Sequence, residues 1–449
     1  MATADDLERL QFVEAELLRR WPESRIQPSL ERIAYLCDAL GSPQLSYPTI
    51  HIAGTNGKTS TTRMIDQIAY KLGYRTGRFT SPHLEKITER ISINNQPISA
   101  DAFVATYNDI ALYLDMVDSR MSNPLSFFEA VTAMAFVAFA EYPVDIGVIE
   151  VGMGGEWDAT NVVDGSVNVI TPIGLDHMEY LGSTIEEIAE TKSGIIKPGS
   201  IAVLSAQEPE VAKILIEKCI ELEAAPLREG IEFSLVKREI AVGGQVITVD
   251  GVNGRYEDLF LPLYGQHQGD NATLAIAAME AFSGEMKLDE DLLRQAFASI
   301  TSPGRMEVLM RDPTVIVDAA HNPHGAISLR NTLSHEFNFT SLVGIFAPMG
   351  DKDVIGMLQV LEPILGRIIL TKNSSDRGLD IATLEKMARS VFGSDRISSF
   401  ATLEETIEAG IAQVKSDSQL NAGSCALLIT GSVVSAGQAR KIVQRLKAE

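Results

Sequence analysis

The feature that most constrains the fold of this chain is an apolar run, residues 50–53, that leads directly into a glycine loop ending in lysine and hydroxyl residues. A helix-periodic stretch follows the loop. A strand, a tight glycine loop and a helix in this order form a cradle for nucleotide phosphates, because loop N–H groups point at phosphate oxygens and the helix dipole adds positive charge. The predicted ATP-binding residues of this cradle are Gly54, Thr55, Asn56, Gly57, Lys58, Thr59 and Ser60.

The spacing of the loop departs from the standard phosphate-binding motif. The standard spacing places the first glycine at position 52, where this chain has Ile52, and its first glycine is Gly54. The loop is therefore shorter than usual. A glycine-lysine-threonine string can also form an ordinary strand-to-helix turn, and of the two interpretations ATP binding is favoured.

Composition excludes several classes of function. The net charge of −22 argues against a nucleic-acid surface, because such surfaces need clustered Lys and Arg. Cys37, Cys219 and Cys425 lie far apart without metal or redox spacing, so we interpret them as core residues of a protein in the reducing cytosol. No apolar run reaches transmembrane length, and the acidic N-terminus is unlike a signal peptide. We expect a cytoplasmic protein that binds neither nucleic acid nor membrane.

The first 300 residues show the alternation typical of an α/β domain. After a helical opening at about residues 4–40, apolar runs at 49–53, 144–151 and 167–173 alternate with helix-periodic stretches such as 59–72. This pattern predicts a P-loop-type ATPase domain built on a mostly parallel sheet. Residues 226–263, with a Gly243-Gly244 turn, predict an antiparallel region that closes this domain.

A turn-forming run at residues 301–304 predicts a domain boundary, which gives domains 1–300 and 301–449. The second is predicted to be a smaller Rossmann-like α/β domain without a dinucleotide fingerprint. Two facing α/β domains suggest a site in the cleft between them. The predicted strands are 314–317, 342–346, 367–370 and 426–429, and the predicted helices are 323–335, 353–364, 381–391 and 403–415.

Polar residues follow several of the predicted strands in the first domain, where open α/β sheets place their ligand sites. The Ser81 hydroxyl, the Glu150 carboxylate and the His177 imidazole are chemically adequate ligands for a magnesium ion shared with ATP. A single histidine after an aspartate is usually a satisfied surface or core residue. The position of His177, one strand after Glu150, favours the ligand interpretation.

Six strings in the chain, taken together and in order, resemble folylpolyglutamate synthase/dihydrofolate synthase, a branch of the Mur ligase superfamily. The shortened phosphate loop is the form that this superfamily uses. The resemblance extends from about residue 25 to the C-terminus. The strings are residues 54–59, 80–84, 150–155 with 158–161, 175–177, 192–197 and 318–323.

The resemblance implies an ATP-dependent ligase that forms an amide. ATP phosphorylates a carboxylate of dihydropteroate or of the glutamyl tail of a folate, and L-glutamate then attacks the acyl phosphate. By motif, Lys58 contacts ATP phosphates, and Lys192 carries a carbamate that would hold a second magnesium ion beside the one held by Ser81, Glu150 and His177. The residues alone also allow Lys192 to be a solvated charge on a helix that a capping box opens at 183–187.

The same resemblance assigns residues to ATP and to the two other substrates. Asn271, Arg305 and Asp318 match ATP-contacting positions, and His321, which we count among the catalytic residues, matches a position associated with the incoming glutamate, as does Ser432. Lys352 matches a further family string. Arg90, Phe127 and Phe128 are weaker candidates for the pteridine or benzoate part of the substrate, and the two phenylalanines suit core packing equally well. The remaining predicted substrate-binding residues are Arg78, Pro82, His83, Asp158 and Thr160.

The chain departs from the family pattern at Glu156-Trp157, where arginine and leucine are usual, so Trp157 either stacks on a flat ligand or packs in the core. One rival interpretation is a cell-wall Mur ligase, but that needs an N-terminal nucleotide-sugar domain that roughly 45 residues cannot supply. Another is a non-catalytic ATP-dependent binding protein. The choice between dihydropteroate and folates stays open, and we expect a monomer whose partners are small molecules.

Overall fold

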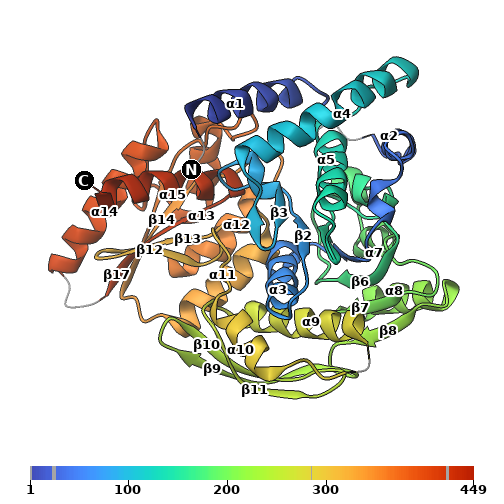
Figure 1. Cartoon of the computed structure of the whole chain (residues 1–449). Helices are drawn as coiled ribbons and strands as arrows, with labels where there is room; N and C mark the ends of the chain where they lie inside the picture. Colours follow the sequence, from blue (N-terminus) through green and yellow to red (C-terminus); the bar gives the residue numbers. More distant parts are fainter. Residues whose placement is uncertain (1–2, 23–26, 285, 421–423, 449) are drawn as a thin grey trace. The chain divides into compact units, whose positions relative to one another are not determined.

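The computed structural model describes residues 3–22, 27–284, 286–420 and 424–448 (Figure 1). The chain divides into two compact units. The first comprises residues 1–239, 246–262 and 268–300, and the second comprises 240–245, 263–267 and 301–449. Two short segments that precede residue 300 in the sequence therefore group with the second unit.

An eight-stranded sheet forms the centre of the first unit, in the order β4-β3-β2-β5-β1-β6-β7-β8. From β2 to β8 all neighbours are parallel, whereas β3 and β4 form an antiparallel edge. Because β1 lies between β5 and β6, the loops that follow these three strands emerge at one edge of the sheet. The strands are β1 (Thr49–Ala53), β2 (Thr76–Phe79), β3 (Ile91–Ile93), β4 (Gln96–Pro97), β5 (Ile146–Glu150), β6 (Gly165–Ile170), β7 (Ile201–Leu204) and β8 (Ala225–Arg228).

Helices and short 3-10 turns accompany this sheet, and several begin with a reciprocal cap. Ser126 and Glu129 form a capping box at α5, and Thr184 and Glu187 form the one predicted at α7. The α-helices are α1 (Ala4–Leu18), α2 (Glu31–Ala39), α3 (Lys58–Lys71), α4 (Ala100–Arg120), α5 (Phe127–Glu141), α6 (Met178–Leu181), α7 (Ile185–Ser193) and α8 (Pro209–Glu221), and the 3-10 turns are η1 (Pro43–Leu45), η2 (Ile87–Arg90) and η3 (Ala159–Val162).

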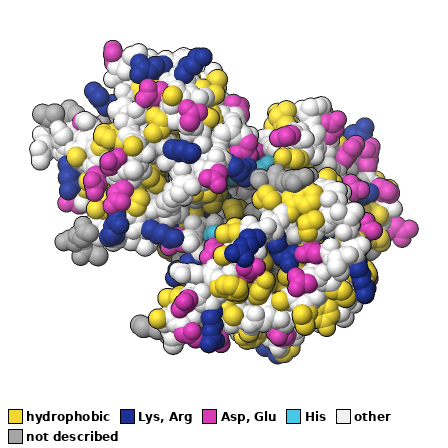
Figure 2. All heavy atoms as spheres, turned by 90° about the horizontal axis from the view of Figure 1, so that it is seen from above, with side chains coloured by type: hydrophobic (Ala, Val, Ile, Leu, Met, Phe, Trp, Pro, Cys, Tyr) yellow, Lys and Arg dark blue, Asp and Glu magenta, His cyan; other side chains and the backbone are white. Residues whose placement is uncertain are grey.

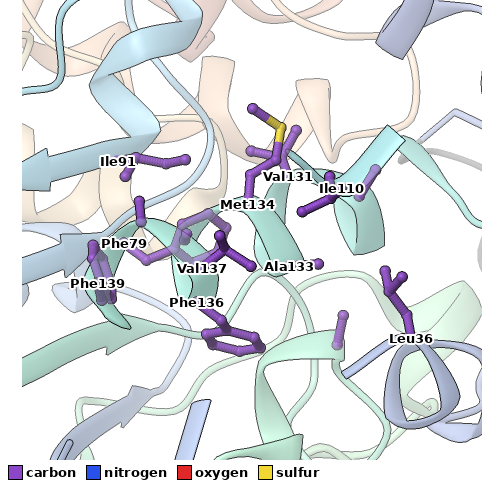
Figure 3. Close-up of a cluster of buried hydrophobic side chains, with 14 of the residues drawn as sticks. Leu36, Phe79, Ile91, Ile110, Val131, Ala133, Met134, Phe136, Val137 and Phe139 are labelled. Carbon is purple, nitrogen blue, oxygen red and sulfur yellow. The ribbon is translucent and has the colours of Figure 1, made fainter. Parts of the chain in front are cut away.

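Helix α5 supplies much of the hydrophobic core of the first unit (Figure 3). It is apolar around most of its circumference, which is typical of a helix that is buried rather than amphipathic. Met134, Phe136 and Phe139 are fully buried and pack in one cluster with Phe79 of β2. This packing supports β2 and β5, the strands that carry two of the predicted site loops.

A three-stranded sheet, in the order β11-β10-β9, covers the region predicted to be antiparallel. Only residues 242–243 join β9 to β10, and two residues can return the chain only into an antiparallel neighbour. The upstream end of that region, β8, instead joins the large sheet as a parallel strand. The elements are β9 (Ser234–Ala241), β10 (Gly244–Asp250) and β11 (Arg255–Leu261), followed by α9 (Gln266–Ser283) and α10 (Glu290–Ala298).

The second unit contains a six-stranded sheet in the order β12-β13-β17-β14-β15-β16. Its strands are parallel except for β12 at the edge. Helices connect the parallel strands, as a Rossmann-like layout requires. The elements are β12 (Glu307–Arg311), β13 (Thr314–Val317), α11 (Pro323–Glu336), β14 (Ser341–Phe346), α12 (Val354–Leu361), η4 (Glu362–Ile364), β15 (Arg367–Leu370), α13 (Ile381–Phe392), β16 (Ile397–Ser399), α14 (Leu403–Leu420), β17 (Cys425–Thr430) and α15 (Val433–Ala448).

The three cysteines are buried, as predicted for core residues. None of the described helices is long and apolar enough to span a membrane. On the face shown in Figure 2, Lys and Arg side chains are interspersed with Asp and Glu. That face therefore carries no continuous basic patch.

Candidate functional site

The phosphate loop joins β1 to α3, and two of its glycines cannot be replaced without a clash. Gly57 caps α3 in the left-handed region with φ 89°, and Gly54 has φ 147°. A Cβ on Gly54 would lie 1.9 Å from Thr171 Oγ1, and one on Gly57 would lie 2.5 Å from Asn271 Oδ1. The loop therefore packs tightly against the end of β6 and against α9, and the predicted ATP residue Asn271 lies beside it.

Lys58 folds back over the loop that precedes it. Its Nζ donates hydrogen bonds to the carbonyl oxygens of Gly54, at 3.0 Å, and Thr55, at 3.3 Å. The Thr55 hydroxyl donates to the carbonyl of Gly174 and accepts from the N–H of that residue, both at 3.0 Å. The ammonium of Lys58 is thus held at the loop, next to a second loop that follows β6.

Glu150 connects three predicted site segments at the end of β5. Its side chain is buried, with only 1% of its surface exposed. One carboxylate oxygen accepts the Thr59 hydroxyl at 2.6 Å, and the other accepts the backbone N–H of Ser81 at 3.3 Å. The structure therefore brings together the start of α3, the loop after β2 and the end of β5, as predicted.

The third predicted magnesium ligand, His177, lies on the loop after β6. Its backbone is left-handed with φ 51°, and its N–H donates to Asp176 Oδ1 at 2.8 Å. Its Nε2 lies 3.9 Å from Oδ2 of Asp176, a residue that the sequence did not single out. No three His, Cys, Asp or Glu side chains among the described residues group as metal ligands. Of the three predicted magnesium ligands, only Glu150 and His177 are residues of those types, because the third is Ser81.

Lys192 lies in the last turn of α7 and is buried, with 4% of its surface exposed. Its Nζ donates to the carbonyl of Gly54 at 2.9 Å. Burial, and after it the nearby charge of Lys58, lower the pKa of Lys192 to about 7, while Asp176 and Asp158 oppose the shift. The alternative of a solvated helix charge is therefore wrong, because this amine faces the phosphate loop in a dry environment.

Asp158 and Thr160 lie on η3 and its cap, close behind the loop after β5. Asp158 accepts the N–H groups of Met153, at 2.8 Å, and Thr160, at 3.0 Å, and it also accepts the Thr160 hydroxyl at 2.6 Å. Burial raises the pKa of the Asp158 carboxyl, against these hydrogen bonds, which lower it. Both residues are buried, and these hydrogen bonds all lie within the first unit.

Arg78 is an internal residue, although the sequence suggested a substrate contact. It is fully buried, and its guanidinium donates to Asp66 Oδ2 at 2.6 Å, to Asn95 Oδ1 at 2.9 Å and to Ser92 Oγ at 2.8 Å. Asp66, on α3, was assigned no role in the sequence. The geometry thus gives Arg78 the role of joining α3 to β2 and β3, and does not favour the predicted substrate contact.

The loop after β2 carries Pro82, which follows a cis peptide bond, and His83. Arg90 Nε donates to His83 Nδ1 at 2.9 Å, and the Arg90 guanidinium lies 5.0 Å from the centroid of the Phe127 ring. Phe127 is buried in the core, and Phe128 packs against Phe79 with ring centroids 5.9 Å apart. The two phenylalanines therefore fill space beside this loop.

The structure also decides the role of Trp157, where the family pattern is broken. Trp157 packs against the hydrophobic cluster around Ile188 and Leu181, and its ring would lie 3.0 Å from a Cβ on Gly154. The N–H of Glu156 donates to the carbonyl of Thr191 at 2.8 Å. Core packing is thus the geometry observed for Trp157, and the Glu156 backbone anchors the end of α7.

Near the phosphate loop, α9 supplies two amides. Gln268 Nε2 donates to Ser60 Oγ at 3.5 Å, and Asn271 Nδ2 donates to Gln268 Oε1 at 3.3 Å. Gln268 was not predicted as a site residue, and only its place one turn before Asn271 on a helix could have indicated it.

The second unit holds its predicted residues at the carboxyl ends of β13 and β17. Asp318 accepts the N–H groups of Met306 and Ala320, both at 2.8 Å, and burial raises the pKa of its carboxyl, while Arg305 lowers it. The ring of His321 bonds to the carbonyl of Ala319 at 3.0 Å through Nδ1. These contacts place Arg305, Asp318 and His321 in one region of the second unit.

Ser432 is buried at the start of α15 rather than open to solvent. Its hydroxyl donates to the carbonyl of Ala347 at 3.0 Å and accepts the N–H of Ser435 at 3.0 Å. Asn373, which the sequence did not single out, donates to Ser432 Oγ at 3.3 Å and to the Ala347 carbonyl at 3.1 Å. A polar residue shortly after a strand was the available signal for Asn373, since loops after β14, β15 and β17 meet there.

Two protein-family models match this chain, one in each of the two predicted domains. Residues 52–279 match the Mur ligase middle domain, and residues 304–432 match the Mur ligase glutamate ligase domain. The first match contains the phosphate loop, Glu150, His177 and Lys192.

Relatives match over nearly the whole chain. A Mycobacterium tuberculosis protein named dihydrofolate synthase/folylpolyglutamate synthase is 47% identical over 99% of this chain and 96% of its own length. The Escherichia coli protein of the same name is 32% identical over 87% of each chain. Neither of these two relatives is named as a cell-wall Mur ligase, the rival interpretation of the sequence.

Two solved structures also match nearly the whole of this chain. The structure of Mycobacterium tuberculosis folylpolyglutamate synthase complexed with ADP matches with a TM-score of 0.94 and 48% identity, over 98% of this chain and 99% of that one. The structure of Escherichia coli FolC in complex with DHPP and ADP matches with a TM-score of 0.84 and 28% identity, over 98% of each chain. The predicted α/β fold is confirmed.

Proposed function

The chain belongs to the Mur ligase family, in its folylpolyglutamate synthase/dihydrofolate synthase branch, and we propose on this basis that it joins L-glutamate to dihydropteroate, to the glutamyl tail of folates, or to both. It is an ATP-dependent ligase that forms an amide bond. The single observation that best supports a nucleotide site is the phosphate loop with Lys58 and Lys192 both donating to the Gly54 carbonyl. Dihydropteroate, folates, L-glutamate and ATP are its proposed small-molecule partners.

The reaction has two steps in which bonds are exchanged. A carboxylate oxygen of the acceptor attacks the γ-phosphorus of ATP and displaces ADP, which gives an acyl phosphate. The amine of glutamate then attacks the acyl carbon, phosphate leaves, and the ammonium protons are released. Lys58 neutralises negative charge that develops on the transferred phosphoryl group, and the N–H groups of the first turn of α3 orient it.

We propose that Glu150, Ser81 and His177 hold a magnesium ion. The donor set suits it, because Glu150 has two carboxylate oxygens at a strand end, beside the loop of Ser81. When bound, magnesium neutralises phosphate charge as a Lewis acid. Glu150 also accepts the Thr59 hydroxyl, which aligns the first turn of α3 with that site.

We also propose that Lys192 is carbamylated and supports a second magnesium ion. A neutral amine is the form that reacts with carbon dioxide, and a pKa of about 7 leaves a large neutral fraction at physiological pH. The carbamate is an anion with two oxygens that can bind magnesium, whereas an amine offers no oxygen ligand. The reaction releases one proton.

We further propose which residues contact ATP, glutamate and the acceptor substrate. ATP is contacted by Asn271, Arg305 and Asp318 in addition to the loop, glutamate by His321 and Ser432, and the acceptor by the loop with Pro82 and His83 and by Asp158 and Thr160. We propose that the enzyme acts in the cytoplasm as a monomer; the three buried cysteines suit a reducing compartment.

Phosphate release measured in parallel with dihydropteroate and tetrahydrofolate, in the presence of ATP, magnesium and L-glutamate, tests the function. We expect phosphate release, with a product larger by one glutamate, with at least one acceptor. ATP binding with no release for either acceptor would instead support a non-catalytic nucleotide-binding protein.

A further inference from the structure

His51 lies in the middle of β1, three residues before Gly54, and no part of its side chain is exposed. Its neighbours across the sheet are Ile149 on β5 and Asn168 on β6. A fully buried imidazole in a central strand is costly unless its polar atoms are satisfied. Its one hydrogen bond among the described residues therefore indicates what this histidine does.

That hydrogen bond leads to the acceptor side of the site. His51 Nε2 lies 2.8 Å from Thr160 Oγ1, and Thr160 Oγ1 lies 2.6 Å from Asp158 Oδ1. The single hydroxyl proton of Thr160 goes to the carboxylate, which is acceptor-only and already takes two backbone N–H groups. His51 must then be the donor to Thr160, through Nε2–H.

The surroundings of His51 keep it in this form. Burial, together with the positive charge of Lys197, lowers the pKa of His51 to about 3, so the imidazole is neutral and has one N–H. With the proton on Nε2, Nδ1 is a bare acceptor, and within the described residues it has no hydrogen-bond partner. An orphaned acceptor is more common in proteins than an orphaned N–H, which favours the same tautomer.

These hydrogen bonds form a relay that runs from His51 through Thr160 to Asp158. The Asp158 carboxylate, at the end of this relay, fixes the loop after β5. Asp158 accepts the N–H of Met153, three residues after Glu150. The adjacent Asn161 donates to the carbonyls of Glu156, at 2.9 Å, and Gly194, at 3.0 Å, and so ties the same segment to the end of α7. His51 is the side chain of β1 that anchors this segment to the strand carrying the phosphate loop.

We propose that His51 is a positioning residue for the acceptor substrate. By donating to Thr160, it commits the Thr160 hydroxyl to Asp158 and holds this carboxylate, and the loop after β5, in register with the phosphate loop. It acts through Thr160 and does not touch the substrate. This proposal rests on the proposed function, in which Asp158 and Thr160 serve acceptor binding.

Two substitutions of matched size test the donor. His51→Gln keeps an N–H close to the position of Nε2, whereas His51→Met has a similar length and no donor. We expect His51→Met to raise KM for dihydropteroate or tetrahydrofolate about tenfold, because a buried bond is lost, with KM for ATP nearly unchanged. His51→Gln should restore most of the acceptor KM. Equal kinetics for the two variants, or equal increases in both KM values, would overturn the proposal and make His51 a packing residue.

A second pair of variants covers the case in which His51→Met does not fold. Thr160→Ser keeps the hydroxyl that His51 contacts, whereas Thr160→Val removes it, so acceptor KM should rise more in Thr160→Val than in Thr160→Ser. Where both fold, adding His51→Met to Thr160→Val should cause no further loss. Additive losses, or equal KM for the Ser and Val variants, would refute the relay. A wild-type enzyme that is inactive with both acceptors overturns the proposed function itself, which is a different result.

Discussion

Lys192 Nζ donates a hydrogen bond of 2.9 Å to the backbone carbonyl of Gly54, which joins the end of α7 to the first residue of the phosphate loop. Lys58 Nζ donates to the same carbonyl at 3.0 Å. Two lysine amines thus converge on one oxygen. Burial, together with the nearby positive charge of Lys58, lowers the pKa of Lys192 and suits a modification that replaces its positive charge with a negative one.

Lys58→Met should abolish amide formation with the fold intact. The ammonium of Lys58 contacts two loop carbonyls, and removing one charge that stabilises a transition state typically lowers kcat by about a hundredfold or more. Phosphate release with the preferred acceptor measures this loss, and the thermal unfolding midpoint serves as the control. Near-normal turnover of Lys58→Met would disprove the assignment of the loop to catalysis.

Bicarbonate should activate the enzyme in a pH-dependent way. Because the pKa of Lys192 is about 7, its neutral, reactive fraction rises as pH increases through that value. After removal of carbon dioxide, we expect activity to fall, and added bicarbonate to restore it more fully at about pH 8 than at about pH 6. A carbamate signal from isotopically labelled bicarbonate, absent in Lys192→Ala, checks the site directly. Activity that is independent of bicarbonate at both pH values, with no carbamate signal, argues against the modification.

Glu150→Gln should increase the magnesium concentration required for activity by about tenfold or more, because a neutral amide is a poorer ligand than a carboxylate. The substitution keeps the shape of a side chain that is 1% exposed and accepts the Thr59 hydroxyl. A magnesium titration of phosphate release gives the midpoint. Glu217→Gln, on a side chain that is 63% exposed on α8, is the matched control and should titrate like wild type.

Gly57→Ala should weaken ATP binding more than its backbone strain alone explains. A Cβ at Gly57 would lie 2.5 Å from Asn271 Oδ1, whereas a Cβ at Gly73, which also has positive φ, meets nothing within 4 Å. Gly73→Ala therefore carries only the left-handed strain, roughly 1–2 kcal/mol of stability. Calorimetric titration with ATP should show a large loss of affinity for Gly57→Ala and none for Gly73→Ala. Adding Asn271→Ala should not restore binding fully if Asn271 itself contacts ATP.

Arg78→Met should destabilise the protein without a specific effect on the acceptor. Removing one partner of a buried ion pair costs about 3–5 kcal/mol, because Asp66 is left buried and uncompensated. Arg75→Met breaks an exposed pair with Asp145, whose loss should destabilise the protein far less. Urea denaturation separates the two variants. A selective increase in acceptor KM for Arg78→Met at unchanged stability would restore the original prediction of a substrate contact.

The elements of the fold were largely predictable from sequence, because apolar runs bounded by turn residues define them locally. The predicted strands at 49–53, 314–317 and 367–370 coincide with β1, β13 and β15. In the second unit, strands β12 and β16 were missed. Both lie at sheet edges, where half-exposed strands carry polar residues and the apolar signal is weak.

The site was predictable where residue type alone determines chemistry. The glycine-lysine loop and a carboxylate at a strand end are typical of phosphate and metal chemistry, and the structure does bring Glu150 to Thr59 and Ser81. His51 was not predicted as a site residue. It stands between two buried isoleucines, so strand periodicity did not mark it, and its partner Thr160 is distant in the sequence.

The sequence by itself determined the ligase family, the phosphate loop and the strand ends that carry polar residues, because those features depend on residue types close together in the chain. Only the tertiary structure decided which polar residues face one another. Arg78 and Asp66 form a buried pair, and burial of Lys192 beside Lys58 sets its pKa. The physical reason is that desolvation and hydrogen-bond partners depend on how strands are ordered in the sheet, and local sequence does not encode that order.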